Sequence, residues 1–452
     1  MTERKFESGH VSRAFRGVTL VTLAWLAGCS QIPAYQRPAA PVPQQFVADS
    51  PATEATALPD WQAYFPDPAL HTLIEAALAN NRDMRIALAR VEEARALAGV
   101  ARADRFPTLE GQANANRTRT PADLSGVGVA RTTSRYDVGL GVTAFELDFW
   151  GRVAALNEAA RAQYLASDEA ARSFRVSLIG DVAGTWYQLI ELTERTQLAD
   201  DTLKTREESL ASDSLVESVR AQWADLKRQR AQTENALRLL TGMAVPLPET
   251  PGATNQTVLT GLAPGLPSDV LLRRPDVRAA EQRLIASNAN VGVARAAFFP
   301  RIALTGNLGT ASSALSGLFD AGSQAWLFQP VLTLPLFDAG RNRANLEVAE
   351  ARKVQAVADY EKTIQQAFRE VADALAARTT YAEQLRAQEA NLRAINARLE
   401  RVKARERAGI ANYLEVLDAS REAFSTEQAL VTSRLQVLSA QVTLYKALGG
   451  GA

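Results

Sequence analysis

The 452-residue sequence is poor in the side chains that most protein chemistry uses. It contains one cysteine and two histidines. A single cysteine cannot form an intramolecular disulfide, and two histidines give little basis for zinc sites or for Ser-His and Cys-His catalysis. The sequence also lacks a Gly-x-x-x-x-Gly-Lys-Ser/Thr loop for a nucleotide. We therefore expect no enzyme, no metal site and no cofactor.

Two further features are absent. The 50 basic residues are balanced by 50 acidic ones, so the net charge is zero and no field attracts nucleic acid. Uninterrupted apolar runs of about 18 residues or more, which a membrane-spanning helix would need, are missing as well. The sequence therefore predicts neither a nucleic-acid-binding protein nor a helical transporter core.

The N-terminus has the pattern of an export signal. Basic residues precede an uncharged stretch at 17–27, which runs into Leu26-Ala27-Gly28-Cys29. That stretch is too short to span a bilayer, which takes about 20 apolar residues. The Leu-x-Gly-Cys motif is typical of a lipoprotein signal, so we expect cleavage after residue 28 and acylation of Cys29, with palmitate as one acyl group. An ordinary signal peptide that happens to contain a cysteine is the alternative.

Most of the remaining chain is a duplication. When 81–107 is laid over 274–300, 12 of the 27 positions are identical without a gap. Residues 99–103 (GVARA) match 292–296, and Phe106-Pro107 matches Phe299-Pro300, all 193 positions apart. Farther along, Gly151-Arg152 matches Gly340-Arg341 at a spacing of 189. A repeat of this length is a whole domain rather than one unit of a solenoid.

The pattern between these matches divides the chain. We expect a signal peptide at 1–28, an acylated tether at 29–60, a first repeat at 61–245, a linker at 246–268 and a second repeat at 269–452. Helical spacing runs through 68–105 and then gives way to alternation of apolar and polar residues. This period of two predicts strands at 108–119, 134–147, 302–311 and 325–334, paired as one hairpin in each repeat.

Very long helices follow each hairpin. Residues 341–408 contain no glycine or proline, and one helix of that length would be roughly 100 Å long. Its apolar residues recur at spacings of three and four, which is typical of a coiled-coil seam. Gly409 ends the run and 410–448 predicts a returning helix, so the second repeat forms a helical hairpin with its tip at 408–412. The first repeat has the same plan from 152 to 242, with its tip near Ser212.

Four strands are too few for one chain to close a transmembrane barrel, which begins at about eight strands. Open edges are not tolerated in lipid, so we expect several chains to pool strands and helices around one axis. The alternative is that the hairpins are edge strands of an ordinary soluble domain.

Several motifs resemble those of the TolC-like outer-membrane efflux proteins, and the NodT-type lipoproteins among them most of all. The motifs are 271–281 (LLRRPDVRAAE), 293–300 (VARAAFFP), 336–341 (LFDAGR), 368–375 (FREVADAL) and Cys29 with 35–38 (YQRP). The resemblance implies a mainly α fold with transmembrane β-strands. In it, a homotrimer forms a 12-stranded barrel and a long α-helical barrel from duplicated coiled-coil hairpins.

The resemblance also implies a function and a location. We expect a lipid-anchored exit duct in the outer membrane that extends into the periplasm. It would passively conduct substrates from an inner-membrane pump of the RND type through a periplasmic adaptor, and would contact outer-membrane lipid. A periplasmic coiled-coil adaptor or structural lipoprotein is the alternative, although it would lack paired membrane strands. An exported hydrolase has less support, because no nucleophile with its base is evident.

The segment 407–418 (RAGIANYLEVLD) resembles the periplasmic tip of that family. The resemblance places Gly409, Asn412 and Tyr413 at the tip, in contact with the adaptor, and Leu414 and Asp418 at the pore constriction. Leu414 and Asp418 are four residues apart and so share one helix face. Without the resemblance, Asp418 reads as a solvated helix charge and Leu414 as a seam residue.

The first repeat departs from the family pattern. From Val182 to Gly242 it spans 60 residues, whereas the matching stretch from Val371 to Gly449 spans 78. The deficit of 18 residues, with no Arg-x-x-x-Gly turn at the end of the first hairpin near Ser212, predicts that this hairpin has lost its tip. If nine residues are missing from each helix, that hairpin is shorter by roughly 13 Å.

Overall fold

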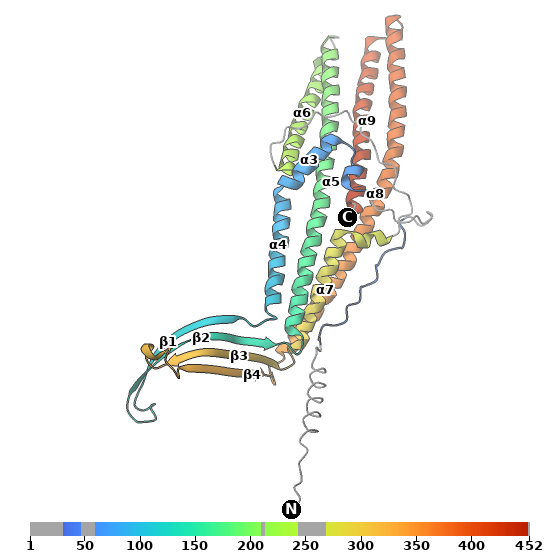
Figure 1. Ribbon diagram of the computed structural model, residues 1–452. Coiled ribbons are helices and arrows are strands. Elements are labelled where there is room, and N and C mark those ends of the chain that lie inside the picture. Colours follow the sequence, from blue (N-terminus) through green and yellow to red (C-terminus); the bar gives the residue numbers. More distant parts are fainter. Residues whose placement is uncertain (1–29, 47–58, 209–212, 243–267, 451–452) are drawn as a thin grey trace, which may run out of the picture. The chain divides into compact units, whose positions relative to one another are not determined.

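The structure is a computed structural model that describes residues 30–46, 59–208, 213–242 and 268–450 (Figure 1). The predicted signal peptide, Cys29, most of the linker and Ser212 lie outside the described residues. The chain divides into two compact units, and each unit takes residues from both repeats. One unit comprises the segment up to Arg37 with 93–164 and 282–357, and the other comprises 38–92, 165–281 and 358–452. The division into repeats and linker therefore stays a prediction about the sequence.

The first unit is built on one antiparallel sheet. Its strands are β1 (Leu109–Thr120), β2 (Arg131–Leu147), β3 (Arg301–Ser312) and β4 (Gln324–Thr333), in the order β1-β2-β3-β4 (Figure 1). The four predicted strands are thereby confirmed to within a few residues. Pairing of β2 with β3 joins the two repeats, and among the described residues β1 and β4 are the sheet edges.

The two faces of the sheet differ in polarity because side chains alternate along each strand. Apolar residues lie on one face and are exposed in the single chain, including Leu140, Leu308, Trp326, Phe328 and Leu332. The other face carries polar residues such as Asn116, Asp137 and Asn307, the last of which lies opposite Gly141. A β-bulge between Val142 and Phe145 interrupts the β2–β3 register, and Ala144 within it has a φ of 51°. A large exposed apolar face of this kind indicates a non-aqueous neighbour.

The second unit is helical. Its main helices are α3 (Pro68–Asn80), α5 (Arg152–Glu208), α6 (Asp213–Thr241), α8 (Arg341–Arg407) and α9 (Tyr413–Ala447), of which α5 and α8 begin in the first unit. The shorter elements of this unit are α2 (Trp61–Tyr64) and η2 (Ser268–Arg273); α4 (Arg82–Ala103) and α7 (Pro275–Ala296) begin in it and end in the first unit, which also contains η3 (Leu315–Gly317). None of the helices in the described segments is long and apolar enough to cross a membrane.

The helical signal predicted across 68–105 is confirmed as two helices, α3 and α4, which are separated at Asn81. This residue has an extended ψ of 131° and is almost fully buried. Its side chain accepts a hydrogen bond from the Met84 amide at 2.9 Å and donates one to the Leu240 carbonyl at 2.9 Å. Asn81 thus caps α4 while it joins α3 to the end of α6.

The core of this unit lies where α3 packs against the long helices. Trp186 of α5 is completely buried, and its indole N–H donates to Asp67 Oδ2 at 2.8 Å. Tyr445 of α9 packs against Phe65 with ring centroids 5.1 Å apart. The Tyr64 hydroxyl donates to the Gln441 carbonyl at 3.0 Å, and burial raises the pKa of Tyr64 to about 12. The core therefore ties the N-terminal helices to both repeats.

The two helical hairpins differ in length, as the sequence predicts. Helix α5 has 57 residues where α8 has 67, and α6 has 29 where α9 has 35. The shortening is uneven, since the differences of ten and six residues correspond to roughly 15 Å and 9 Å of helix. The expectation of nine residues from each helix is thus only approximate.

Candidate functional site

The end of the α8–α9 hairpin is a tight turn built around Gly409. Gly409 has a φ of +74°, a backbone conformation that residues other than glycine and asparagine rarely adopt. The Ile410 amide donates to the Arg405 carbonyl and the Gly409 amide to the Glu406 carbonyl, both at 2.8 Å. These bonds satisfy the last carbonyls of α8, so the helix ends at Arg407 without losing backbone hydrogen bonds.

Asn412 starts the returning helix. Its side chain accepts from the Glu415 amide at 3.0 Å, while the Glu415 carboxylate accepts from the Asn412 amide at 3.5 Å. This reciprocal pair is a capping box, which typically contributes about 1 kcal/mol of helix stability. The turn and the cap together fix the direction in which α9 leaves the tip.

The predicted site residues at this end of the hairpin lie close together. Tyr413, Leu414 and Ile410 are exposed, Leu414 to 67%. Asp418 lies one turn after Leu414 on α9, and its carboxylate is exposed as well. The opposite face of α9 carries the buried Ala419 and Ala423, so Leu414 and Asp418 point away from the hairpin seam. Their roles in a constriction or in contact with an adaptor stay predictions.

Asp418 has a neighbour that the sequence argument missed. Arg421 donates to Asp418 Oδ1 at 3.1 Å, and both side chains are mostly exposed. Arg421 also has a second cation near it, Arg206 of α5. Burial and the positive charge of Arg421 lower the pKa of Arg206. The Arg206 guanidinium lies over the Phe424 ring at 5.9 Å. The opposite charges at spacing three in 418–421 were a usable signal for this pair.

The first hairpin has its own apolar seam up to its end. Leu203 of α5 and Val219 of α6 are buried in one cluster with Leu226 and, from α9, Phe424. Arg220 of α6 reaches back to Glu207 of α5 at 2.8 Å. The two helices of the shortened hairpin are therefore held together by these contacts close to the last described residues of α5.

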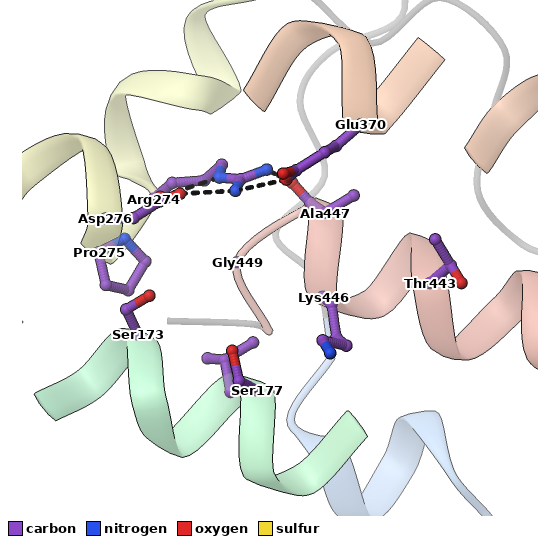
Figure 2. Close-up of a pocket in the computed structure, with 11 residues that line it drawn as sticks. Ser173, Ser177, Arg274, Pro275, Asp276, Glu370, Thr443, Lys446, Ala447 and Gly449 are labelled. Atoms are coloured by element: carbon purple, nitrogen blue, oxygen red, sulfur yellow. Dashed lines mark hydrogen bonds and ion pairs between the residues drawn. The ribbon is translucent and has the colours of Figure 1, made fainter. Parts of the chain in front are cut away.

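A polar pocket of about 330 Å³ lies at the other end of α9 (Figure 2). It is lined by the start of α7, by α8 and by the end of α9, with serines of α5 opposite. Arg274 is 7% exposed and is its central group. Its guanidinium donates to Asp276 at 2.6 Å, to Glu370 at 2.8 Å and to the Ala447 carbonyl at 2.5 Å.

The charges of this pocket are paired. Burial acts to lower the pKa of Arg274, but the carboxylates of Asp276 and Glu370 outweigh it and the pKa is raised. Lys446 at the rim pairs with Asp181 at 2.9 Å. Asp276 also accepts from the Val277 amide at 2.9 Å in the first turn of α7. The pocket therefore joins three helices through Arg274 and leaves no cation of its own for an anionic ligand.

Comparison with known proteins identifies the chain. The model of the outer membrane efflux protein family matches residues 73–214 and 266–450. The chain belongs to the outer membrane efflux protein family. Among its relatives, the solvent efflux pump outer membrane protein SrpC of Pseudomonas putida is 47% identical, over 97% of this chain and 98% of the relative. The outer membrane protein OprJ of Pseudomonas aeruginosa is 45% identical, over 97% and 96%.

Solved structures give the same result. A membrane protein from Pseudomonas aeruginosa matches with a TM-score of 0.88 and 45% identity, over 93% of this chain and all of the other. The open state of the Neisseria gonorrhoeae outer membrane channel MtrE matches with a TM-score of 0.87 and 38% identity, over 94% and 98%. The fold is therefore TolC-like, and the protein is the outer-membrane exit duct of an efflux system. The family consists of transport channels rather than enzymes.

The comparisons also bear on the short first hairpin. The alignment with SrpC runs over 464 residues, which exceeds the 452 of this chain, so the relative contains residues that have no counterpart here. The first match to the family model ends at residue 214, at the second residue of α6. The family model therefore covers α5 and leaves most of α6 unmatched.

We predict that Arg274→Met destabilises the efflux channel by about 2 kcal/mol. Hydrogen bonds to charged groups contribute about 1.5–3 kcal/mol each, but both carboxylates are partly exposed and regain water. Arg369→Met on α8 is the control, because its pair with Asp373 is exposed and should contribute less than about 0.5 kcal/mol. Thermal midpoints of the detergent-purified proteins test this. Equal midpoints for the two variants would contradict a clamping role for Arg274.

Proposed function

We propose that three copies of this chain assemble into one lipid-anchored duct that receives its substrates from an inner-membrane pump through a periplasmic adaptor. The observation that carries the proposal is the four-stranded sheet with an exposed apolar face and two unpaired edges. Backbone groups at open edges cannot remain unpaired in lipid, and three such sheets supply the strands of a closed barrel. Acylation of Cys29 adds a lipid anchor on the periplasmic side.

The partners of the duct, and not a binding pocket in the duct itself, would determine which substrates it conducts. The described residues contain no group of three or more His, Cys, Asp or Glu placed to hold a metal, and the pocket at Arg274 has its charges paired. Selection would then be made mainly by the pump. Relatives named for solvent, toluene and antibiotic efflux are compatible with a duct that accepts whatever its pump delivers.

Membrane fractionation tests the assembly and the anchor together. We expect the wild-type protein in the outer-membrane fraction as a trimer by native mass, with a mass increase on the Cys29 peptide that matches acyl chains. Cys29→Ala should lose the acyl mass and keep partial insertion through the apolar sheet face. A wild-type protein that is monomeric and soluble would refute the proposal, and an unmodified Cys29 would refute the anchor alone.

The second prediction of this assembly concerns charge at the tip. Asp418 and Arg421 would form two neighbouring rings of three charges each, and the narrow end of the pore would sense both. Asp418→Asn should shift the ion preference several-fold toward anions, and Arg421→Gln should shift it toward cations. Conductance and reversal potential in planar bilayers measure this. If neither variant changes the ion preference, Asp418 and Leu414 do not line the constriction.

The third prediction concerns the missing tip. Only the three second-repeat hairpins would be full length, so adaptor docking would depend on the turns at Gly409. No atom lies within 4 Å of the position where a Cβ on Gly409 would be, so Gly409→Val acts only through the strained φ. It should abolish efflux, whereas Gly409→Asn, which tolerates that φ, should retain it.

Drug susceptibility in a pump-competent strain that lacks its own duct provides the readout. A variant whose first repeat receives an 18-residue tip copied from the second repeat should dock more strongly and should suppress the effect of Gly409→Val. Resistance that is equal in the wild type, the grafted variant and Gly409→Val would show that docking does not depend on these tips.

A further inference from the structure

A second pocket, of about 460 Å³, lies in the first unit where the sheet meets the starts of two long helices. Helix α5 begins there at Arg152 and helix α8 at Arg341. Both arginines line the pocket, together with Arg301 and the aromatic side chains of Trp150 and Phe299. Cationic and aromatic side chains therefore border one cavity, and the function proposed above makes no use of it.

The carboxylates of this pocket are already held by partners. The lining has three arginines and three carboxylates, so the formal charges cancel. The side chain of Glu146 is 10% exposed, accepts two hydrogen bonds from Arg152 at 2.7 Å and pairs with Arg301 at 2.6 Å. The two aspartates accept from backbone amides at the starts of α5 and α8, Asp148 at 2.7 Å and Asp338 at 2.8 and 2.9 Å.

Arg341 has no such partner. The match of 151–152 with 340–341 makes Arg341 the counterpart of Arg152, and at the same spacing of 189 the counterpart of Glu146 is Pro335. The second repeat thus has the arginine without its carboxylate. In the part of the chain that the structure describes, Arg341 forms no ion pair. It is therefore the one guanidinium of the described lining that is available to an anion from outside.

The place of Arg341 in its helix makes the missing partner significant. It is the first residue of α8, where the dipole of a 67-residue helix disfavours a cation. Arg152 has the same unfavourable place at the start of α5, but its paired hydrogen bonds to Glu146 offset this. A guanidinium binds a carboxylate, sulfonate or phosphate in the same bidentate way. An anion in the pocket would occupy the place that Glu146 has in the first repeat.

The aromatic side chains narrow the class of anion. The rings of Trp150 and Phe299 stack with centroids 4.7 Å apart and an interplanar angle of 21°. The indole N–H donates to the Pro300 carbonyl at 2.9 Å, which fixes the orientation of the Trp150 ring. Both rings are half-buried and line the pocket. Because aromatic rings pack well on one another, an anion that carries an aromatic ring fits this pocket better than a small inorganic one.

The strand residues of the pocket belong to the polar face of the sheet. Arg301 lies opposite Thr333, one residue along from Leu332 of the apolar face. Side chains alternate along a strand, so Arg301 and Thr333 are on the polar face, and the ion pair with Arg301 places Glu146 there too. In the proposed duct the apolar face meets lipid. The polar face would then line the lumen, through which substrates pass.

We propose that this pocket binds organic anions with an aromatic ring as they pass through the duct. Arg341 binds the acid group, and Trp150 packs against the ring. A single free guanidinium gives weak retention, which slows such anions without excluding other compounds, so selection stays with the pump. The placement on the conduction path rests on the proposed function, whereas the binding itself does not.

Isothermal titration of the detergent-purified, full-length protein with 2-naphthalenesulfonate tests the site. Arg341→Gln removes the cation. Arg343→Gln on α8 is the matched control, because its guanidinium is 84% exposed and pairs with Glu347 at 3.3 Å. Pro335→Glu keeps Arg341 and adds the carboxylate that the first repeat has at Glu146, and Pro335→Gln is its neutral control. Thermal midpoints show that each variant is folded.

We expect the wild type, Arg343→Gln and Pro335→Gln to bind 2-naphthalenesulfonate with the same affinity. Arg341→Gln and Pro335→Glu should weaken binding by about tenfold or more, because the anion loses a hydrogen-bonded contact with a charged group. Methanesulfonate, which has no ring, should also bind more weakly than 2-naphthalenesulfonate. No binding to the wild type, or unchanged affinity in Arg341→Gln, would overturn the site. Equal affinities of the two sulfonates would overturn the aromatic class of ligand.

Planar bilayers test the placement in the lumen. Near its dissociation constant, 2-naphthalenesulfonate should reduce the single-channel current of the wild type, and Arg341→Gln should need about tenfold more of it. Binding without any effect on the current would overturn the placement in the lumen while the proposed duct stands. A protein that binds the probe but forms no channel would refute the proposed function and leave the binding site intact.

Discussion

The structure depends on one constraint, which is that backbone N–H and C=O groups must be paired before a strand can leave water. The sheet of this chain has four strands and an apolar face that is exposed in the single molecule. Among the described residues, its two edge strands β1 and β4 have backbone groups along one side that no other strand pairs with, and another chain could satisfy them. In the proposed function, assembly completes the sheet rather than adding to a finished fold.

The long helices satisfy their own backbone hydrogen bonds, so contacts between side chains hold them in place. Helix α8 runs for 67 residues, much of it exposed along its distal half, and stays helical there without a globular core around it. Its seam with α9 and the turn at Gly409 hold it in a hairpin. Near its middle, α8 contributes Glu370 to the clamp at Arg274, which also binds the carbonyl of Ala447 at the end of α9. Side-chain packing therefore stabilises the hairpin near the core, whereas the turn at Gly409 and the cap at Asn412 stabilise its tip.

Much of this architecture could be predicted from the sequence because its signals are local and periodic. The strands follow from alternation over 10 to 17 residues. The end of α8 follows from Gly409, whose backbone tolerates a positive φ, and the start of α9 follows from the capping side chain of Asn412. The hydrogen bond from Asn81 to Leu240 could not be predicted in this way, because the two residues are 159 positions apart. The ion pair between Arg274 and Glu370, which are 96 positions apart, could not be predicted for the same reason. The pair of Asp418 with Arg421 could have been predicted, because opposite charges three residues apart on a helix are neighbours.

The central claim is that three copies of a duplicated chain form one ring, in which the two repeats are equivalent except at the shortened first hairpin. An electron cryomicroscopy map of the full-length protein in lipid measures this directly. The account predicts a ring of three chains with near sixfold repetition at the sheet. It also predicts strict threefold repetition at the periplasmic end, where only three hairpins reach the tip. Six hairpins of equal length, or a ring of any number of chains other than three, would contradict it.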